Sequence, residues 1–409
     1  MFTALTILYN LLIATYHLFT PRHASRLKAM QPRRAPDVDH APHVALLVPM
    51  RNELFHARRC LDALFAQDYP PTHYELIVID DGSTDGTAEL LGDIHVQRGR
   101  WSHPRLRILK TPPLQPGWTG KSQALWWGSQ AVADTVRWLL FVDADTFLQP
   151  AALSTLVREA QARDLHLLSL QPYEELVSWW EKVIYPVSLM QLMRSVDLRA
   201  VNNDARVDMA WASGQCLLVR HDAYISAGTH EAVRGDLLES VALARRLRER
   251  GYCVRMANGA ALAHTRKWEG FGDLWASYQK EGIVLYQGSL LRVALTTLAL
   301  ALLDLLPFLW PWLALHRQRS RRHVLTAFAF ALVPPLAVVA KRMRGAKYVG
   351  ISGWYAFTHP IGVGATLIIA WSSLIRLWLS QPIDWKGRRY LPQRWAMWWS
   401  ERRRAEAVS

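Results

Sequence analysis

The chain has 409 residues, enough for one large α/β domain and further segments at the usual scale of about 100–200 residues per domain. Lysine and arginine outnumber aspartate and glutamate by 48 to 34, which indicates an anionic partner such as nucleic acid, anionic lipid or a phosphorylated substrate. The basic residues gather beside apolar runs, and the sequence has neither zinc-finger spacing nor an RNP-type motif. A membrane protein is therefore expected and a nucleic-acid partner is not.

The chain opens with an uncharged apolar run at residues 2–19, which has about the length needed to cross a bilayer. A cleaved signal peptide is the alternative. The run lacks a basic stretch before it, and Pro21-Arg22 is a poor cleavage site. An uncleaved anchor is the better interpretation. The three cysteines are widely scattered, form no disulfide or metal-site pattern, and fit a reducing compartment.

Short apolar runs then alternate with helical periodicities from residue 43 to about residue 256. Four of the runs predict buried strands, at residues 44–48, 75–79, 106–109 and 138–142. Strands that alternate with helices indicate an α/β fold with a mostly parallel sheet. Ligands bind such sheets beyond the carboxyl ends of the strands, and the acidic motifs fall at those positions.

Three of the predicted strands end in acidic residues, namely Glu53, the pair Asp80-Asp81, and Asp143-Ala144-Asp145. Crowded like charges are costly unless a cation or hydrogen-bond donors offset them. Two carboxylates spaced i, i+2 can reach one divalent cation, which would then bridge a diphosphate. The alternatives are ordinary ones: Asp145 would cap the next helix, and the segment after Asp80 would be a turn with Asp85 at a helix start.

A glycine-bearing loop at residues 115–122 places Lys121 near the start of a helix. The loop fails the spacing of a nucleotide P-loop because Gln115 stands where that motif needs glycine. A lysine in this position still suits a phosphate or pyrophosphate group. A solvated loop lysine is the alternative.

Asp236 and Glu239 lie where a helix is expected to open, ahead of Gly251. They fit a capping box, with Asp236 as the N-cap residue and Glu239 three residues later. They also fit a catalytic role, with Glu239 as the general base for an acceptor hydroxyl. The pattern by itself leaves both interpretations open.

The last third of the chain is apolar. Residues 268–287 predict an amphipathic, aromatic-rich helix that lies on the membrane or packs on the sheet. Segments 291–315, 323–340 and 359–379 have roughly spanning length, and Pro334-Pro335 favours a re-entrant or interfacial middle segment. The expected division is an anchor over 1–20, a basic linker over 21–42, a catalytic domain over 43–288, a transmembrane region over 289–380 and a basic tail over 381–409.

Taken in order, these motifs resemble the family 2 glycosyltransferases with the GT-A fold, over roughly residues 43–287. Within that family the chain is most similar to the membrane enzymes that glycosylate carotenoids or hopanoid-type lipids. That closer likeness rests on Gly117-Trp118-Thr119-Gly120-Lys121, on Gly214-Gln215, and on the tail Trp385-Lys386-Gly387-Arg388-Arg389-Tyr390.

The resemblance implies a Rossmann-like nucleotide-sugar-binding domain with an N-terminal and several C-terminal membrane helices. It implies a multi-pass protein of the plasma (inner) membrane with a cytoplasmic catalytic domain. The implied reaction is an inverting transfer from a nucleotide diphosphate sugar, foremost a UDP-sugar, to a hydroxyl or carboxyl of a membrane lipid. The implied site comprises Pro49, Arg51, Glu53, Asp80 and Asp81 around the uridine, Lys121 at the phosphates, Asp143 at the ribose, phosphate or metal, and Asp145 on Mg²⁺ or Mn²⁺.

Two departures from the family pattern bear on function. The family usually carries Glu-Asp at the base position with the aspartate as base, whereas this chain has Glu239-Ser240. Either Glu239 is the base, Asp236 reaches in, or the protein is a catalytically degenerate nucleotide-sugar-binding protein. The Gln-x-x-Arg-Trp motif of processive synthases is missing after this helix, and Gln393-Arg394-Trp395 comes too late. A polyprenyl-phosphate sugar transferase is the alternative within enzymes.

Overall fold

The computed structural model describes residues 2–19, 27–33, 41–99, 102–195, 197–198, 200–286, 288–316 and 328–390. Most of the predicted basic linker, the tail beyond residue 390 and the Gln393-Arg394-Trp395 motif lie outside these residues. The chain forms two compact units. The sheet unit comprises residues 25–175 and 196–267, and the helical unit comprises residues 1–24, 176–195 and 268–409.

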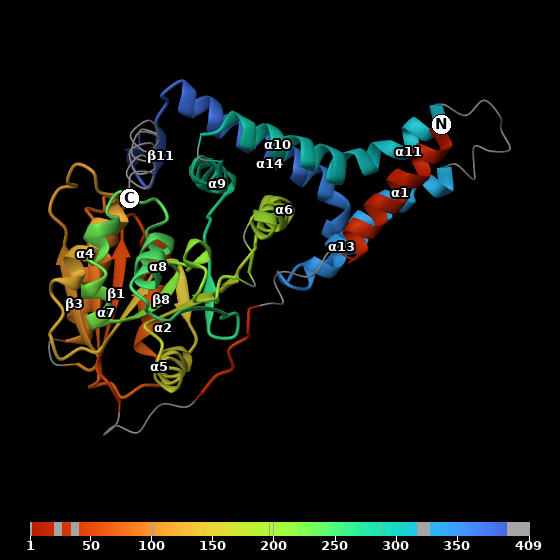
Figure 1. The fold of residues 1–409 in the computed structure, drawn as a ribbon. Helices are drawn as coiled ribbons and strands as arrows, with labels where there is room; N and C mark the ends of the chain where they lie inside the picture. The colour runs from red at the N-terminus through yellow and green to blue at the C-terminus, as the bar shows by residue number, and fades with distance from the viewer. Residues whose placement is uncertain are drawn as a thin grey trace, which may run out of the picture. The chain divides into compact units, whose positions relative to one another are not determined.

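The sheet unit is built on a seven-stranded sheet with strand order β3-β2-β1-β4-β8-β6-β9 (Figure 1). The strands are β1 (Val44–Met50), β2 (Tyr74–Asp80), β3 (Arg105–Lys110), β4 (Trp138–Val142), β6 (Leu167–Gln171), β8 (Cys216–Arg220) and β9 (Val254–Asn258). Strands β3, β2, β1 and β4 run parallel, and β8 is antiparallel to both β4 and β6. The four predicted strands and the mixed α/β fold with a central sheet are confirmed.

Six helices and a smaller sheet complete this unit. The helices are α2 (Leu54–Phe65), α3 (Thr87–Arg98), α4 (Gly120–Ser129), α5 (Ala152–Ala162), α7 (His221–Ser226) and α8 (Glu239–Glu249). The smaller sheet has the order β5 (Thr146–Leu148), β10 (Ala263–Thr265), β7 (Tyr173–Glu174). Strand β5 follows directly on the acidic motif after β4, so the small sheet positions that motif.

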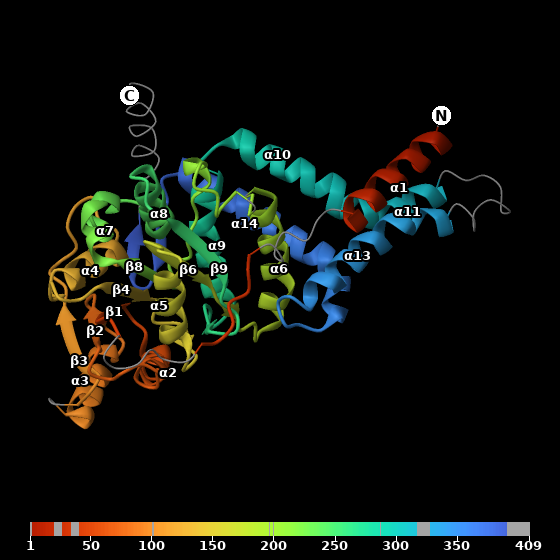
Figure 2. The same cartoon turned by 60° about the horizontal axis from the view of Figure 1, so that its bottom comes forward.

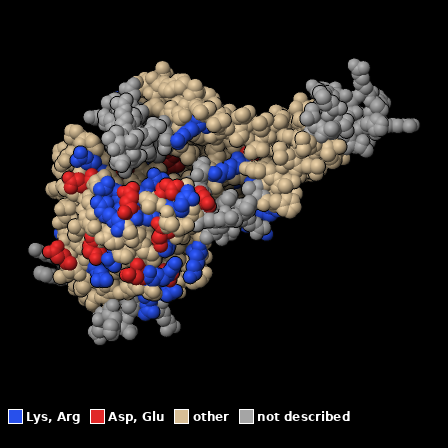
Figure 3. Space-filling model, in the orientation of Figure 1, with Lys and Arg blue, Asp and Glu red and all other residues tan. Residues whose placement is uncertain are grey.

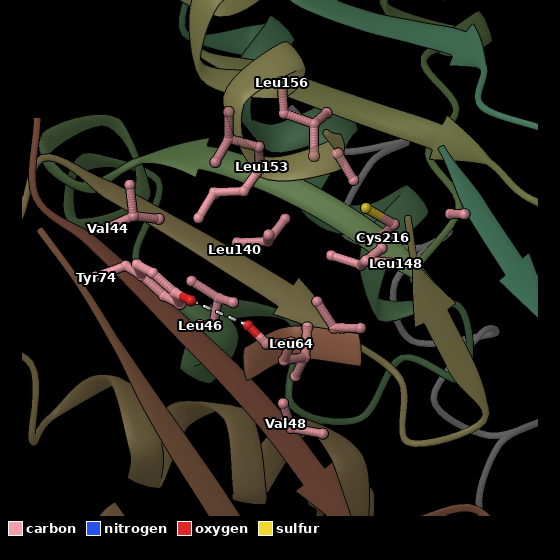
Figure 4. Packing of buried hydrophobic residues seen from close by; sticks show 14 of the residues in the cluster. Val44, Leu46, Val48, Leu64, Tyr74, Leu140, Leu148, Leu153, Leu156 and Cys216 are labelled. Atoms are coloured by element: carbon pink, nitrogen blue, oxygen red, sulfur yellow. Dashed lines mark hydrogen bonds between the residues drawn. The ribbon is translucent and has the colours of Figure 1, made fainter. Parts of the chain in front are cut away.

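Alternate residues of the central strands face opposite sides of the sheet and form two separate cores. One core contains Leu46, Val48 and Leu140 with Leu64 of α2 and Leu153 and Leu156 of α5 (Figure 4). The other contains Leu47, Ile77 and Phe141 with Leu125 of α4 and Leu243 and Leu247 of α8. Tyr74, at the start of β2, donates a hydrogen bond of 3.3 Å to the carbonyl of Leu64, which ties the strand to the end of α2. Helices on both faces explain why the central strands read as continuous apolar runs.

The helical unit consists of helices joined by short segments. They are α1 (Phe2–Phe19), α6 (Trp179–Ser195), α9 (Phe271–Tyr286), α10 (Leu290–Leu300), a π-helical turn (Ala301–Leu305), α11 (Leu306–His316), α13 (Val333–Ala346) and α14 (His359–Trp378). Helix α9 confirms the helix predicted over 268–287, and it packs against α14 and α6 within this unit.

Two helical stretches among the described residues are long and apolar enough to cross a membrane, Leu290–Leu313 and Gly353–Trp378. A shorter apolar helix covers Ile7–Phe19. In the segment predicted at 323–340, residues 323–327 lie outside the described residues. Pro334 and Pro335 stand in the first turn of α13, which is 14 residues long and includes Arg342. Proline is tolerated in a first helical turn because the amide it lacks would have no partner there.

The tail segment that contains Trp385-Lys386-Gly387-Arg388-Arg389-Tyr390 forms a hairpin of β11 (Ile383–Trp385) and β12 (Arg388–Tyr390). The register pairs Trp385 with Arg388, which leaves a two-residue turn at Lys386 and Gly387. Both turn residues have positive φ, 47° and 72°. Two-residue hairpin turns favour this conformation, and glycine adopts it without steric cost. The glycine of the motif is therefore explained by backbone geometry.

Gly128 provides a test of how tightly the second core is packed. A Cβ at Gly128 would lie 2.7 Å from Ile79 Cδ1 and 3.1 Å from Leu47 Cδ2. We expect Gly128→Ala to lower the free energy of unfolding by about 1–3 kcal/mol, because overpacking a core displaces its side chains. Gly92→Ala in α3 is the control, since nothing lies within 4 Å of its added carbon and alanine favours helix. Thermal unfolding of the purified variants makes the comparison, and equal melting temperatures would contradict the packing account.

Candidate active site

The turn between β4 and β5 presents two carboxylates on one side. Ala144 is only 2% exposed and points into the core, so its neighbours Asp143 and Asp145 share the opposite, partly exposed side. The Asp143 amide donates to the carbonyl of Gln215, and the Thr146 amide donates to the carbonyl of Asp143 at 3.0 Å. The chain continues into strand β5. Asp145 therefore caps no helix, and that alternative interpretation is wrong.

Asp145 is held by the small sheet. Its carbonyl accepts hydrogen bonds from the Thr265 hydroxyl at 3.1 Å and from the Arg266 amide at 2.9 Å. Its carboxylate Oδ1 lies 3.3 Å from the Thr146 hydroxyl and 3.4 Å from the Thr265 hydroxyl. The backbone position and one carboxylate oxygen are thus fixed by side chains from two strands.

The second acidic motif, Asp80 and Asp81, lies where the ends of β1 and β2 are paired. The sheet register pairs Met50 with Asp80, and the Asp81 amide donates to the Met50 carbonyl at 2.8 Å. Both aspartates are buried, at 5% and 4% exposure. Asp80 accepts a hydrogen bond from the Ser83 amide at 3.0 Å, and Asp81 accepts one from the Thr111 hydroxyl at 2.9 Å. Thr111 follows β3, so three strand ends meet here.

Arg51 lies at the same strand ends, against the backbone that follows β2. Its guanidinium donates to the carbonyls of Asp81 and Gly82, the latter at 2.9 Å. Pro49 lies one strand position earlier than Met50, within β1 and opposite Ile79. The structure therefore brings Arg51, Asp80 and Asp81 together, while Pro49 is part of the strand that supports them.

Glu53 lies at the start of α2 and is 6% exposed. Its carbonyl accepts hydrogen bonds from the amides of His56 and Ala57, and its own amide donates to the Thr87 hydroxyl at 2.9 Å. Asp85 accepts from the amide of Thr87 at 3.0 Å and from the amide of Leu54 at 3.1 Å. The expected helix-start role of Asp85 is confirmed, since its carboxylate satisfies an amide at the beginning of two helices.

The buried thiol of Cys60 in α2 lies near carboxylates of two acidic motifs. Burial raises the pKa of Cys60, and the negative charges of Asp145, Glu53 and Asp143 raise it further. Carboxylates from the ends of β1 and β4 therefore lie near one another, as the predicted topology required.

Lys121 bridges two carboxylates from distant parts of the chain. Its ammonium Nζ lies 2.7 Å from Asp143 Oδ1 and 3.0 Å from Glu239 Oε1. Thr119 provides the N-cap of α4, accepting a hydrogen bond from the Ser122 amide at 3.2 Å, and this cap fixes the first turn that carries Lys121. The interpretation of Lys121 as a solvated loop lysine is wrong.

Gly214 leaves room for this bridge. A Cβ at Gly214 would lie 2.9 Å from Lys121 Nζ and 3.1 Å from Glu239 Oε1. Real side chains essentially never approach so closely, so any larger residue would push the ammonium or the carboxylate away. The Gly214-Gln215 motif thus takes part in the ion-pair network, which the sequence did not indicate.

Helix α8 begins at Glu239 itself. Its N-cap residue is Leu238, whose side chain makes no capping hydrogen bond, and the Asp236 amide donates to the carbonyl of Val233. The capping box predicted for Asp236 and Glu239 is therefore wrong. The chain before the helix is drawn instead to α4, because the Arg234 carbonyl accepts a hydrogen bond of 2.7 Å from the Thr119 amide.

The charges of Lys121, Asp143 and Glu239 shift one another's pKa values. Burial raises the pKa of Glu239, but the Lys121 ammonium outweighs burial, and the pKa ends below its ordinary value. Burial raises the pKa of Asp143, and Asp145 and Glu239 add to the rise while Lys121 opposes it. Burial acts to lower the pKa of Lys121, yet its two carboxylate partners raise it. Glu239 is thus an anion at neutral pH, beside a charged ammonium.

Ser240 stands where the resemblance leads one to expect an aspartate. Its hydroxyl donates to the Ala212 carbonyl at 3.2 Å, and the side chain is 7% exposed. Asp236 is also buried, at 5% exposure. Of the Glu239-Ser240 pair, Glu239 is the residue that contacts Lys121. His230, missed in the sequence, lies near it; burial lowers the pKa of His230 to about 4, so the ring is neutral.

A divalent cation is compatible with the residues after β4. Within the described ranges, no group of three or more His, Cys, Asp or Glu side chains is arranged to hold a metal ion. Mg²⁺ is commonly bound through one or two carboxylates together with substrate phosphates. Asp143 and Asp145 provide such a pair on one side of their turn, so the donor set fits a cation that binds together with a diphosphate.

Comparisons with known proteins identify a family match within the chain. Residues 45–205 match the family model described as Glycosyl transferase family 2. The chain is 30% identical over 104 residues to Glycosyltransferase AglE of Haloferax volcanii, covering 25% of this chain and 31% of that protein. It is 22% identical over 242 residues to 4,4'-diaponeurosporenoate glycosyltransferase of Staphylococcus haemolyticus, covering 58% and 60%. Each match thus spans less than two thirds of the relative.

Among solved structures, mannosyltransferase PcManGT from Pyrobaculum calidifontis, in complex with GDP-Man and Mn2+, superposes with a TM-score of 0.48 at 17% identity. The superposition covers 91% of this chain and 96% of that one. The family match defines the class for part of the chain, since residues 45–205 match a glycosyltransferase domain. The matched family is family 2, in agreement with the resemblance drawn from the motifs.

We expect Lys121→Met to lower the melting temperature more at neutral than at acid pH. The lowered pKa of Glu239 contributes stability above the ordinary glutamate value of 4.5, and this stability is lost as the pH falls through the folded-state pKa. Without Lys121, burial alone acts on Glu239, its pKa rises, and the buried anion costs stability until it is protonated.

Thermal unfolding at about pH 7.5 and about pH 4 measures this difference. Lys110→Met, at an exposed lysine that ends β3, is the matched control and should change little at either pH. A loss of equal size at both pH values would show that the ion pairs do not stabilise the site.

Proposed function

We propose that the protein is an inverting glycosyltransferase that moves a sugar from a nucleotide diphosphate sugar, foremost a UDP-sugar, to a hydroxyl or carboxyl of a membrane lipid. The observation that carries the proposal is the bridge from Lys121 to both Asp143 and Glu239. It joins the residue expected at the donor phosphates to the carboxylate expected to act as base.

The nucleoside is proposed to bind at the ends of β1 and β2. Asp80 and Asp81 are buried carboxylates there, and Arg51 is held against the backbone beside them. Carboxylate oxygens accept hydrogen bonds from the N–H of a uracil and from ribose hydroxyls. Glu53 and Pro49 belong to the same strand end and shape the site from the β1 side.

The diphosphate is proposed to lie between this corner and Asp145. Asp143 and Asp145 are the residues that would hold Mg²⁺ or Mn²⁺, and the cation would neutralise charge on the departing diphosphate. Lys121 supplies a further positive charge within 2.7 Å of Asp143. A preorganised cation beside the leaving group stabilises charge that develops in the transition state.

Glu239 is proposed as the general base. Its anionic carboxylate accepts the proton of the acceptor hydroxyl while the acceptor oxygen attacks the anomeric carbon. The new carbon–oxygen bond forms on the face opposite the bond to the diphosphate, which breaks and releases the nucleotide. The proton remains on Glu239 and the electron pair leaves with the diphosphate, so one displacement inverts the anomeric configuration. Lys121 favours the anionic, proton-accepting form.

A membrane-lipid acceptor is supported by the surface of the helical unit. Ile361, Ile368 and Ile375 of α14 are 50%, 61% and 48% exposed and repeat every seven residues along one face. Helices α10, α11 and α1 show an almost uncharged surface in the view of Figure 3. Contiguous exposed apolar patches mark membrane or protein contacts. We therefore propose a multi-pass protein of the inner membrane with a cytoplasmic catalytic domain.

Two other functions remain alternatives. A polyprenyl-phosphate sugar transferase would use the same donor site with a lipid phosphate as acceptor. A degenerate nucleotide-sugar-binding protein is suggested by Ser240, whose hydroxyl is bonded to backbone. Sugar turnover by the purified chain separates the last from both enzymes, and lipid mass spectrometry of cells with and without the gene separates the two acceptors.

We expect Glu239→Gln to reduce turnover by about 10²–10⁴, because loss of a general base removes the proton acceptor. The melting temperature should change less than the rate, since glutamine has the same shape. Asp236→Asn is the comparison, at a buried carboxylate three residues earlier. If Asp236→Asn is folded but inactive while Glu239→Gln turns over normally, Asp236 is the base and our assignment is wrong.

The metal proposal concerns Asp145. EDTA should abolish transfer, and Mn²⁺ or Mg²⁺ should restore it. Asp145→Asn should lower turnover by about 10²-fold or more while keeping the fold, because a bound cation supplies several kcal/mol of charge stabilisation. Asp134→Asn, at an exposed aspartate before β4, is the control. Full activity of Asp145→Asn together with indifference to EDTA would refute the metal assignment.

A further inference from the structure

A fully buried carboxylate lies within the most apolar part of the helical unit. Asp304 has 0% exposure and stands in the π-helical turn between α10 and α11. It accepts hydrogen bonds from Arg194 Nη1 at 2.9 Å and Nη2 at 3.3 Å, and it lies 3.2 Å from His359 Nε2. A π-turn inside an α-helix is uncommon and often marks a functional position.

More positive than negative charge surrounds Asp304. Lys341 lies close enough to Arg194, Arg344 and Asp304 for their charges to interact. The Lys341 ammonium is 4.8 Å from the centre of the Tyr16 ring, and the Arg194 guanidinium is 5.5 Å from the same ring. The cations come from α6 and α13, and Tyr16 comes from α1, so three helices far apart in sequence meet here.

Arg342 adds a second buried cation to this part of α13. It is 5% exposed, and its Nη2 donates to the carbonyls of Lys182 and Val183 at 3.1 and 3.2 Å. Among the described residues, no carboxylate contacts its guanidinium. We name Arg194, Lys341, Arg342, Arg344 and Asp304 the α13 cluster. It contains four cations and one carboxylate.

Two donors of the α13 cluster have no hydrogen-bond partner in the described part of the chain. They are the buried Nε atoms of Arg194 and Arg342. A buried charge is costly unless it is paired and hydrogen-bonded. Excess positive charge and unsatisfied donors together call for an anion with several acceptor oxygens, which is the chemistry of a phosphate group.

We propose that the α13 cluster binds the phosphate head group of an anionic membrane lipid. The surroundings favour a lipid over free phosphate. Leu302 and Leu309, two and five residues from Asp304, are 45% and 58% exposed, and Leu336 of α13 is 59% exposed. Helices α1, α11 and α13 lie side by side in both views (Figures 1 and 2). Acyl chains would cover these leucines while the phosphate accepts from the cations.

This site is separate from the proposed transfer reaction, because every residue of it belongs to the helical unit. Asp304 holds Arg194 in place, and Lys341 and Arg344 provide charge that no described carboxylate besides Asp304 balances. The bound lipid would stabilise the packing of α1, α6 and α13, so its removal is expected to lower the melting temperature of the whole chain.

The test is a lipid titration of the full-length chain in detergent, followed by native mass spectrometry and thermal unfolding. We expect phosphatidylglycerol to bind and to raise the melting temperature, with little effect of phosphatidylcholine or inorganic phosphate. Lys341→Gln and Arg344→Gln should each weaken phosphatidylglycerol binding about fivefold, the usual contribution of one basic residue near an anionic lipid surface. Lys341→Arg, which keeps the charge, should bind as the unaltered chain does.

Arg292→Gln, at an exposed arginine in the first turn of α10, is the matched control and should leave lipid binding unchanged. Should Lys341→Gln fail to fold, Arg344 still decides, because its side chain is exposed and donates a hydrogen bond of 3.3 Å to a backbone carbonyl, that of His17. Equal binding of phosphatidylglycerol and phosphatidylcholine would overturn the proposal. Stabilisation by inorganic phosphate of the same size, or an equal loss of binding in Arg292→Gln and Arg344→Gln, would overturn it too.

Discussion

The ammonium group of Lys121 is the interaction on which the candidate active site depends. It is the positive charge that holds Asp143, at the end of β4, and Glu239, at the start of α8, in one place. Burial by itself raises the pKa of both carboxylates, and Lys121 opposes that effect in both cases. The position of α4, the small residue at Gly214 and the late start of α8 all serve to bring this ammonium between its two partners.

Each unit contains a cluster of charged side chains in which one sign of charge is in excess. The excess is negative in the sheet unit and positive in the helical unit. In the sheet unit, Asp143 from a strand end and Glu239 from a helix start both contact Lys121, Asp145 lies nearby, and the excess negative charge suits a cation that arrives with a diphosphate. In the helical unit, cations from α6 and α13 gather around Asp304, and the excess positive charge suits a lipid phosphate. In both places a single residue of the minority charge organises the cluster, and the remaining charge is left for a ligand.

The Glu239-Ser240 pair departs from the Glu-Asp pair that the resemblance leads one to expect. Ser240 lies in the first turn of α8, and its hydroxyl donates to the Ala212 carbonyl. Glu239 then is the residue that meets Lys121, and its lowered pKa gives it the protonation state that a base requires. The departure from the usual sequence is thus compatible with catalysis, because the anion is positioned by a residue from another helix.

The sequence by itself determined the strands, the helices and the acidic strand ends, because strong apolar runs and glycine-rich turns act locally. It also determined the family, through motifs that follow three strands in the expected order. It could not determine that Glu239 begins its helix, since Asp236 and Glu239 have ideal capping spacing, whereas the structure has Leu238 as the N-cap residue. Nor could it show that Lys121, Gly214 and Glu239 meet, or that Arg194 reaches Asp304. Lys121 and Glu239 lie about a hundred residues apart in the chain, and so do Arg194 and Asp304. Only the packing of complete elements brings their charges within a few ångströms.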